Sequence, residues 1–414
     1  MMIRSNEVSI SNLFTLENIL LLTYLCMRLN PDFQSDSIIY SAVPVLMAFV
    51  LSFKLWAKRE ISVMKVYSSD YVRWIVVFTA FSFTSFIWSI EPAWSLVNFL
   101  GINLITMIPL ALYISNENRI KNVLKIFILA TMITSMYMFL FTDVSMMSIE
   151  GADRLGSEDG WNSNGIGMMC SAAAVFCLYL HSESKYTRGF YTLCTVLCIG
   201  IVLLTGSRSA LFRVIMCWLF YKIFGRSRGK ILHFFLALFV GVVALCLVMN
   251  IPFLYSTVGV RIENLLSFVT GSKTGAVDSS TIIRAAMMEY GIGWFLENPI
   301  LGYGIDNFRY LWSGVAGYET YAHSNYVDLL VGVGIVGTII YYSFHVKQIL
   351  VLYNGLKERR KLCAAFFAIL CTFIILDIIT VTYNSRFSQI ILCLVYCAGF
   401  VAANKDTAIQ RQII

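Results

Sequence analysis

Charged side chains are scarce in this sequence. Of its 414 residues, 31 are Lys or Arg and 24 are Asp or Glu, so charged residues make up 13% of the chain. Hydrophobic residues make up 58%, and the mean hydropathy is +0.74. This balance excludes a soluble globular protein and places the sequence among helical membrane proteins.

The polar loops lack cysteine, because all 11 cysteines lie within or at the edge of apolar runs. We therefore expect neither a disulfide framework nor a zinc site, and interpret the cysteines as small apolar packing residues. The sequence also lacks HExxH and CxxC pairs, a GxSxG elbow and a Walker loop, and we predict no metal and no cofactor. It has no basic helix with aromatic platforms, so nucleic acid is not an expected partner.

Twelve apolar runs predict an all-α, polytopic membrane protein, since a bilayer core needs about 20 apolar residues per helix. We expect one integral membrane domain over residues 1–414. The first run is the weakest, because Glu17 and Arg28 lie inside it, and the eighth contains Arg213. The runs cover 13–30, 37–56, 71–90, 95–115, 122–142, 165–181, 187–205, 209–225, 231–251, 323–345, 362–383 and 386–403.

Lys and Arg gather in alternate loops between these runs. Such loops face the cytoplasm, so we place both termini inside and the chain in the cytoplasmic (inner) membrane. Two long segments then lie outside, residues 143–164 and the large loop 252–322. The basic loops contain Lys54, Lys58, Arg59 and Lys65; Arg119, Lys121 and Lys125; Lys185 and Arg188; Lys222, Arg226, Arg228 and Lys230; and Lys347, Lys357, Arg359, Arg360 and Lys361.

Residues 279–337 mix aromatics, glycines, one arginine and one histidine. The pattern predicts an amphipathic helix over 280–297 that lies on the membrane surface, with Arg284 towards the headgroups. The alternative for Arg284 is a salt bridge, to Glu289 or to a loop carboxylate. Asn298-Pro299 ends this helix, and two glycines then form a turn; the apolar positions are Ile282, Ile283, Ala286, Met287, Tyr290 and Trp294, and the glycines are Gly302 and Gly304.

Arg208 is the first candidate for substrate binding. It lies in a tight turn where a new helix begins, so free backbone N–H groups and a guanidinium meet at one place. This combination favours an anion site, and phosphate is the expected anion. The alternative is an interfacial arginine that extends to the lipid headgroups. Arg154, in the other long external segment, is a further candidate for an anion contact.

His323 is the candidate for proton transfer. It stands at the start of the tenth run, where a helix N-terminus disfavours the imidazolium and leaves a neutral ring that can accept a proton. The alternative is a helix cap or a packing residue. We interpret Asp328, in the same run, as a partner of Arg213 or of an external arginine.

Several segments, in this order, resemble the superfamily of O-antigen ligases and O-antigen polymerases. The resemblance covers residues 150–345 well and the remainder by hydropathy only. No single motif is specific, but the ordered set is. The matching segments are RLG at 154–156 with Asn164 downstream; TGSRSAL at 205–211; Arg284 through Trp294 with ENPILGYG at 297–304; and AHSNY at 322–326 with Gly332, Gly334 and Gly337.

The resemblance implies a reaction and roles for four residues. Members of this superfamily transfer a glycan from undecaprenyl diphosphate to an acceptor hydroxyl on the outer side of the cytoplasmic membrane. By resemblance, Arg208 and Arg284 bind the diphosphate, with Arg154 as a further contact, and His323 activates the acceptor. The expected reaction is metal-independent and inverts the anomeric carbon.

The implied partners are lipid-linked glycan donor and acceptor, membrane lipids, a flippase and a chain-length regulator. The external segment that contains PILGYGIDNF and AHSNY resembles the polymerases of the superfamily more than the ligases. This favours polymerisation of O-antigen, capsule or exopolysaccharide repeat units. A ligase that passes the polymer to lipid A core, or to protein, is the alternative. A transporter is the non-enzyme alternative, but it predicts critical charges near the bilayer midplane, whereas the unusual residues here gather at one face.

Overall fold

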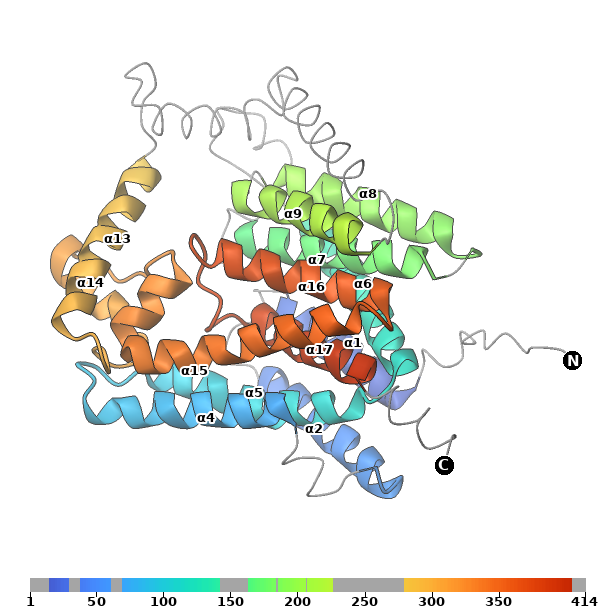
Figure 1. Ribbon diagram of the computed structural model, residues 1–414, viewed down its shortest axis with the longest axis horizontal. Coiled ribbons are helices and arrows are strands. Elements are labelled where there is room, and N and C mark those ends of the chain that lie inside the picture. Colours follow the sequence, from blue (N-terminus) through green and yellow to red (C-terminus); the bar gives the residue numbers. More distant parts are fainter. Residues whose placement is uncertain are drawn as a thin grey trace, which may run out of the picture.

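The computed structural model describes residues 15–29, 38–60, 69–141, 163–183, 185–205, 207–225 and 279–403. Every regular element in these ranges is a helix, which confirms the predicted all-α class. The helices (Figure 1) are α1 (Leu16–Leu29), α2 (Ile38–Ala57), α4 (Asp70–Thr84), the 3₁₀ turn η3 (Ser85–Ile87), α5 (Trp94–Tyr113), α6 (Glu117–Phe141), α7 (Ser163–His181), α8 (Arg188–Leu204), α9 (Arg208–Phe224), α13 (Ser279–Glu297), α14 (Phe308–Ala316), α15 (Asn325–Gly355), α16 (Arg360–Leu376) and α17 (Arg386–Ala403).

Each predicted span within the described ranges coincides with a helix, and the span 231–251 lies outside them. Among the described helices, 5 are long and apolar enough to cross a membrane, and three more are apolar but shorter. The chain is therefore a multi-pass membrane protein, while the total of twelve spans and the external loop 252–322 stay predictions. The longer helices are Trp94–Tyr113, Glu117–Phe141, Asn164–His181, Asn325–Gly355 and Arg386–Ala403.

The predicted end of the eleventh run is wrong. The eleventh run was expected to continue to residue 383, but α16 ends at Leu376 and Asp377 caps it. The Asn325 side chain causes this, because its Oδ1 accepts hydrogen bonds from the backbone N–H groups of Thr382 (2.8 Å) and Tyr383 (3.0 Å). The connection to α17 is thereby held in a non-helical form against the start of α15.

The weak first run is explained by a charge pair. Glu17, buried in α1, pairs with Lys54 near the end of α2, so the carboxylate does not stand alone among apolar side chains. The described cysteines are free thiols, and most of them are buried, as on α7, where Cys170 and Cys177 are fully buried. Cys246 lies outside the described residues.

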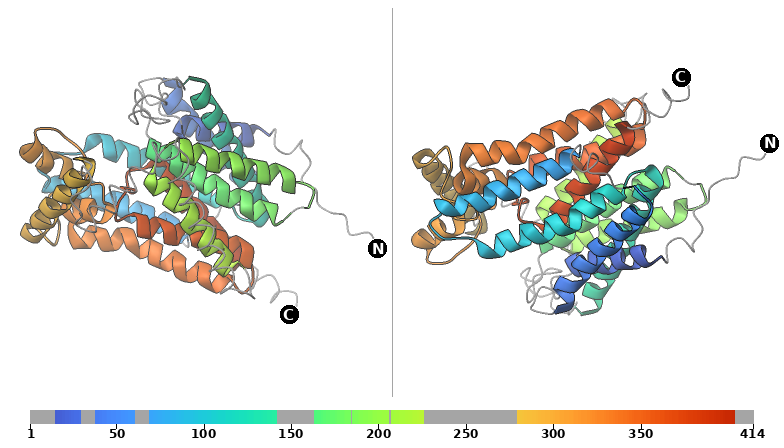
Figure 2. Two further views of the ribbon diagram at one scale, coloured as in Figure 1. Left: turned by 90° about the horizontal axis from the view of Figure 1, so that it is seen from above. Right: turned by 90° about the horizontal axis from the view of Figure 1, so that it is seen from below.

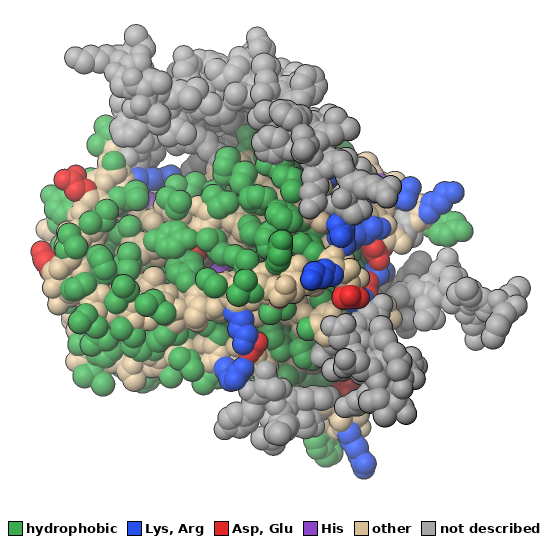
Figure 3. Space-filling view, in the orientation of Figure 1, with side chains coloured by type: hydrophobic (Ala, Val, Ile, Leu, Met, Phe, Trp, Pro, Cys, Tyr) green, Lys and Arg blue, Asp and Glu red, His purple; other side chains and the backbone are tan. Residues whose placement is uncertain are grey.

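Helices α13 and α14 lie together at one end of the bundle, beside the first turns of α15 (Figures 1 and 2). Much of the surface between the two ends is apolar, as Figure 3 shows in green, which suits contact with lipid. Lys and Arg on this face gather mainly towards the opposite end (Figure 3).

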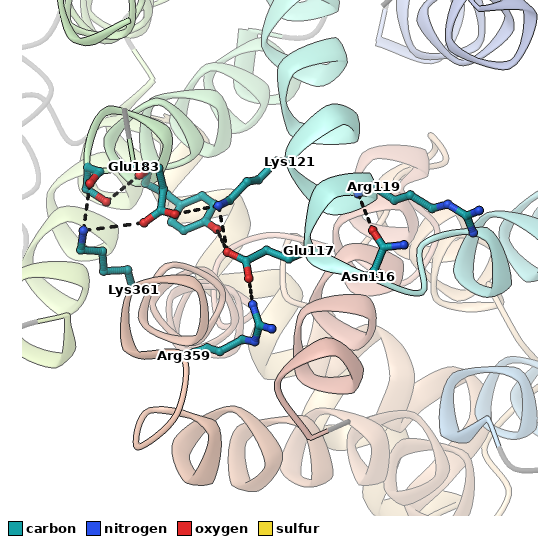
Figure 4. Close-up of polar contacts among 9 residues, drawn as sticks. Asn116, Glu117, Arg119, Lys121, Glu183, Arg359 and Lys361 are labelled. Carbon is teal, nitrogen blue, oxygen red and sulfur yellow. Dashed lines mark hydrogen bonds and ion pairs between the residues drawn. The ribbon is translucent and has the colours of Figure 1, made fainter. Parts of the chain in front are cut away.

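A network of ion pairs ties three loops together at that opposite end (Figure 4). Glu117 at the start of α6 pairs with Lys121 (2.9 Å) and with Arg359, which precedes α16. Lys121 also pairs with Glu183 of the α7–α8 connection (2.7 Å), and Lys361 lies 3.6 Å from Glu183. These are loops that the charge pattern predicts to share one side of the membrane.

Candidate functional site

The site is built on a turn that follows α13. The helix ends at Glu297 as the Asn-Pro pair predicts, and Gly302 and Gly304 then adopt positive φ angles of 68° and 99°. Only glycine adopts this backbone form readily, which explains both glycines of the predicted turn. Of the predicted apolar positions, Met287 is buried and Trp294 half-buried, whereas Ile282, Ile283 and Tyr290 are exposed; the position of this helix on the membrane surface stays a prediction.

The turn packs directly on a break in α15. Gly334 has φ 61° and ψ −168°, which interrupts the helical backbone in the middle of the element. The Tyr303 N–H donates to the Val331 carbonyl (2.8 Å), and the Ile335 N–H donates to the Pro299 carbonyl (2.9 Å). The two glycine-containing segments seen in the sequence are therefore two sides of one backbone contact.

The same turn is fixed on its other side by the α4–α5 connection. Asn307 and Glu91 exchange two hydrogen bonds of 3.0 Å, from the Glu91 N–H to Asn307 Oδ1 and from Asn307 Nδ2 to the Glu91 carbonyl. The Ile305 N–H donates to Ser85 Oγ (3.1 Å). Residues far apart in the chain thus make the turn rigid.

His323 lies just before α15, which begins at Asn325, two residues later than the sequence indicates. Ser324 is the N-cap, and its side chain accepts a hydrogen bond from the Val327 N–H. His323 itself is half-buried and has a positive φ of 53°. Its ring centroid lies 4.4 Å from that of Tyr321. The histidine is therefore not the cap of the helix, and its backbone is held in a form that few non-glycine residues adopt.

Burial, and second the positive charge of Arg284, lower the pKa of His323 from 6.5 to about 4. The imidazole is neutral at physiological pH, as predicted, but the cause is burial and not the helix N-terminus. Because the charge of Arg284 acts on the imidazole, Arg284 of α13 lies near His323. Arg284 is half-buried, and the alternative salt bridge to Glu289 is not formed; no ion pair joins Arg284 to any residue in the described ranges.

A buried polar cluster lies next to the His323 backbone. Asp328 accepts hydrogen bonds from the Ala322 N–H (2.9 Å) and from the Tyr383 hydroxyl (3.0 Å). That hydroxyl is also 3.4 Å from Asp306, which binds Arg309 at 2.9 Å. The cluster thus joins the turn after α13, the start of α15 and the connection between α16 and α17.

The interpretation of Asp328 as a partner of Arg213 is wrong. The Arg213 guanidinium lies 4.8 Å from the Phe373 ring centroid on α16, and none of its nitrogens has a hydrogen-bond partner among the described residues. Its charge acts on Asp377, the cap of α16, and not on Asp328. The arginine in the Asp328 cluster is Arg309, which the sequence did not single out.

Arg208 is the first residue of α9, and its side chain is outside the description. Ser207 caps the helix, and its hydroxyl donates to Asn164 Oδ1 on α7 (2.7 Å). Helix α9 runs antiparallel to α16, because Arg213 meets Phe373 whereas Cys217 meets Ala368 (3.9 Å). The N-terminus of α9 therefore points towards the same end of the bundle as the His323 loop. Arg154 lies outside the described residues.

The sequence analysis missed three residues of this site, namely Asp306, Arg309 and Tyr383. Asp306 and Arg309 are the charged members of GIDNFR, and their i, i+3 spacing was an available signal. No sequence signal marked Tyr383, because it reaches the site only through the non-helical connection after α16. Within the described residues, no three His, Cys, Asp or Glu side chains form a group that could hold a metal ion.

A family model described as O-antigen ligase matches residues 193–342, which contain Arg208, Arg284 and His323. No curated protein matches the chain. The matched segment carries the arginine turn, the α13 helix with its glycine turn, and the histidine loop described above. In this segment the chain is similar to the O-antigen ligase family.

Proposed function

We propose that this protein polymerises undecaprenyl-diphosphate-linked oligosaccharide repeat units into O-antigen, capsule or exopolysaccharide on the outer side of the cytoplasmic membrane. The observation that carries the proposal is the arrangement at His323. A neutral, half-buried imidazole lies near the half-buried Arg284, which has no ion-pair partner among the described residues, within the segment that matches the family. A proton acceptor next to a site for an anion is what transfer from a diphosphate donor requires.

The chemistry follows from these groups. His323 accepts the proton of the acceptor hydroxyl while its oxygen bonds to the anomeric carbon of the donor glycan. The bond from that carbon to the diphosphate oxygen breaks, and its electron pair leaves with the lipid diphosphate. Arg284 and Arg208 stabilise the charge that develops there, through charge-assisted hydrogen bonds. Direct attack inverts the anomeric configuration.

Donor binding strengthens the base in this scheme. The charge of Arg284 contributes to the low pKa of His323, about 4 in the free protein. A diphosphate bound to Arg284 offsets that charge, and its own negative charge favours the imidazolium. Both effects raise the pKa of His323 at the moment when the acceptor must lose its proton.

A ligase is the second candidate, favoured by the description of the matching family model as O-antigen ligase. The same groups serve either reaction, because only the acceptor differs. A polymerase adds the chain to another lipid-linked repeat unit, whereas a ligase needs lipid A core or protein as its acceptor.

Purified protein in vesicles, given the lipid-linked repeat unit of its own host, tests the proposal. Gel electrophoresis should show a ladder of longer lipid-linked chains. Product that forms only after lipid A core or a protein acceptor is added makes the protein a ligase. Glycan that crosses the vesicle membrane without new glycosidic bonds makes it a transporter and refutes both enzyme assignments.

A further inference from the structure

The backbone ahead of His323 is held by one buried carboxylate. His323 has a positive φ of 53°, a form disfavoured for residues with a β-carbon, so the surrounding contacts must maintain it. Ala322, the residue before it, is 1% exposed, and its N–H donates to Asp328 Oδ2 at 2.9 Å. Asp328 lies in the first turn of α15 and is itself 1% exposed. The contact therefore fixes the loop to the helix where the imidazole leaves the backbone.

The carboxylate is fixed in turn by a tyrosine from another part of the chain. Asp328 Oδ1 accepts a hydrogen bond from the Tyr383 hydroxyl at 3.0 Å. Tyr383 is fully buried, and its backbone is bound on both sides: its N–H donates to Asn325 Oδ1 (3.0 Å), and its carbonyl accepts from Gln389 Nε2 (2.9 Å). Because the tyrosine backbone is immobile, its hydroxyl sets the orientation of the carboxylate.

We infer that Tyr383 and Asp328 are positioning residues, which hold the His323 imidazole towards Arg284 through the Ala322 backbone. The reaction role of this inference rests on the proposed function; the placement of His323 does not. The groups that act on the ring are Tyr321, from the same loop, and Arg284, from α13. Loss of the Ala322 contact lets the loop relax, so the ring moves away from Arg284 and gains contact with water.

Three variants separate the hydrogen bonds from the volume of the side chain. Asp328→Leu keeps the branching at Cγ, although leucine is larger, and removes both acceptors. Asp328→Asn is the conservative variant, because its carbonyl oxygen can accept from Ala322 and its amide can donate to the Tyr383 oxygen. Tyr383→Phe removes one hydroxyl. Tyr71→Phe is the matched control, since Tyr71 on α4 is equally buried and its hydroxyl has no hydrogen-bond partner in the part of the chain that the structure describes.

The first readout does not need activity. Diethyl pyrocarbonate modifies neutral imidazole, so the pH dependence of its reaction with His323, corrected with a His323→Gln variant, reports the pKa of that ring. The midpoint should lie near pH 4 in the unmodified protein. It should rise towards about 6.5 in Asp328→Leu and Tyr383→Phe, and modification should become faster, because a displaced ring is solvated. Asp328→Asn and Tyr71→Phe should keep the original midpoint.

The second readout is transfer. With His323 misplaced, kcat should fall about 10- to 100-fold in Asp328→Leu and Tyr383→Phe while the donor KM changes little. Unchanged midpoints in both variants overturn the inference, even if less folded protein is recovered. If Asp328→Leu does not fold, the midpoint measured for Tyr383→Phe alone tests the inference. Shifted midpoints in a protein without transfer activity would support the positioning role and refute the proposed function.

Discussion

At the scale of single residues, burial and the charge of Arg284 set the protonation of His323. The base must be neutral to work, and its pKa of about 4 keeps it neutral as the pH falls well below 6.5. The value of kcat/KM, which reports the free protein, should therefore fall only as the pH falls through about 4. In the donor complex the diphosphate raises the pKa of His323, so activity should be lost at a higher pH there.

Two pH profiles check this prediction. The acid limb of kcat/KM, which reports the free protein, should lie near pH 4, and the acid limb of kcat should lie above it. Arg284→Gln should move the acid limb of kcat/KM to a higher pH, because a positive charge near the His323 ring is removed. The total rate should nevertheless fall. Limbs that coincide near pH 6.5 in both profiles would contradict the account.

Arg208 should not tolerate lysine. A guanidinium can bind two phosphate oxygens at once, whereas an ammonium acts as a single point charge. We expect both Arg208→Lys and Arg208→Ala to lower kcat/KM by about 100- to 1000-fold, the range seen when one such donor is lost. Steady-state transfer rates check this, with Arg73→Lys as control, since Arg73 is an exposed partner of Asp70 on α4. Near-normal activity of Arg208→Lys would remove the diphosphate role.

At the scale of elements, the break in α15 is the feature on which the site depends. A Cβ atom at Gly334 would lie 2.2 Å from the Ile300 carbonyl oxygen, and φ is 61° there. Gly334→Ala should therefore displace the turn after α13. The strained backbone alone should cost about 1–3 kcal/mol.

Thermal unfolding in detergent checks this prediction, with Gly314→Ala as control. Gly314 lies in α14 and has no atom within 4 Å of its added Cβ, so alanine should leave the midpoint unchanged or raise it slightly. Equal midpoints for the two variants would show that the contact between the turn and α15 is unimportant.

Local patterns predicted the elements well, and non-local contacts explain what they missed. The α13 helix and its glycine turn follow from Asn298-Pro299 and from Gly302 and Gly304, all within one short segment. The end of α16 could not be predicted, because apolar residues continue past Leu376 and the helix is stopped by Asn325, 52 residues before Asp377. For the same reason, no pattern in the sequence placed Tyr383 beside Asp328.

At the scale of the whole molecule, two groups of loops lie at opposite ends of the bundle. The loops around Glu91, Asn307, His323 and Tyr383 meet at the end that carries the site. The ion pairs of Glu117, Glu183 and Arg359 join other loops. The charge pattern predicted each group to share one side of the membrane, so the packing agrees with the predicted alternation. Which side faces the cytoplasm stays a prediction.

The ion-pair network should affect stability and not catalysis. Glu117→Gln weakens one ion pair within α6, to Lys121, and one to Arg359 just before α16, and we expect a loss of about 0.5–2 kcal/mol. The melting temperature in detergent should fall, while kcat at a permissive temperature stays the same. Glu358→Gln is the control, because Glu358 is exposed and forms no ion pair with a described residue. A large fall in kcat for Glu117→Gln would mean that the two ends are coupled.

The most direct test of the central claim is a single-turnover reaction with labelled lipid-linked repeat unit, in which donor binding, glycosidic bond formation and release of undecaprenyl diphosphate are followed together. The account predicts that the unmodified protein forms one new bond for each lipid diphosphate released, and that His323→Ala binds the donor with similar affinity but releases almost none. Equal release rates for the two proteins would contradict the role of His323, and no release with any acceptor would contradict the enzyme assignment.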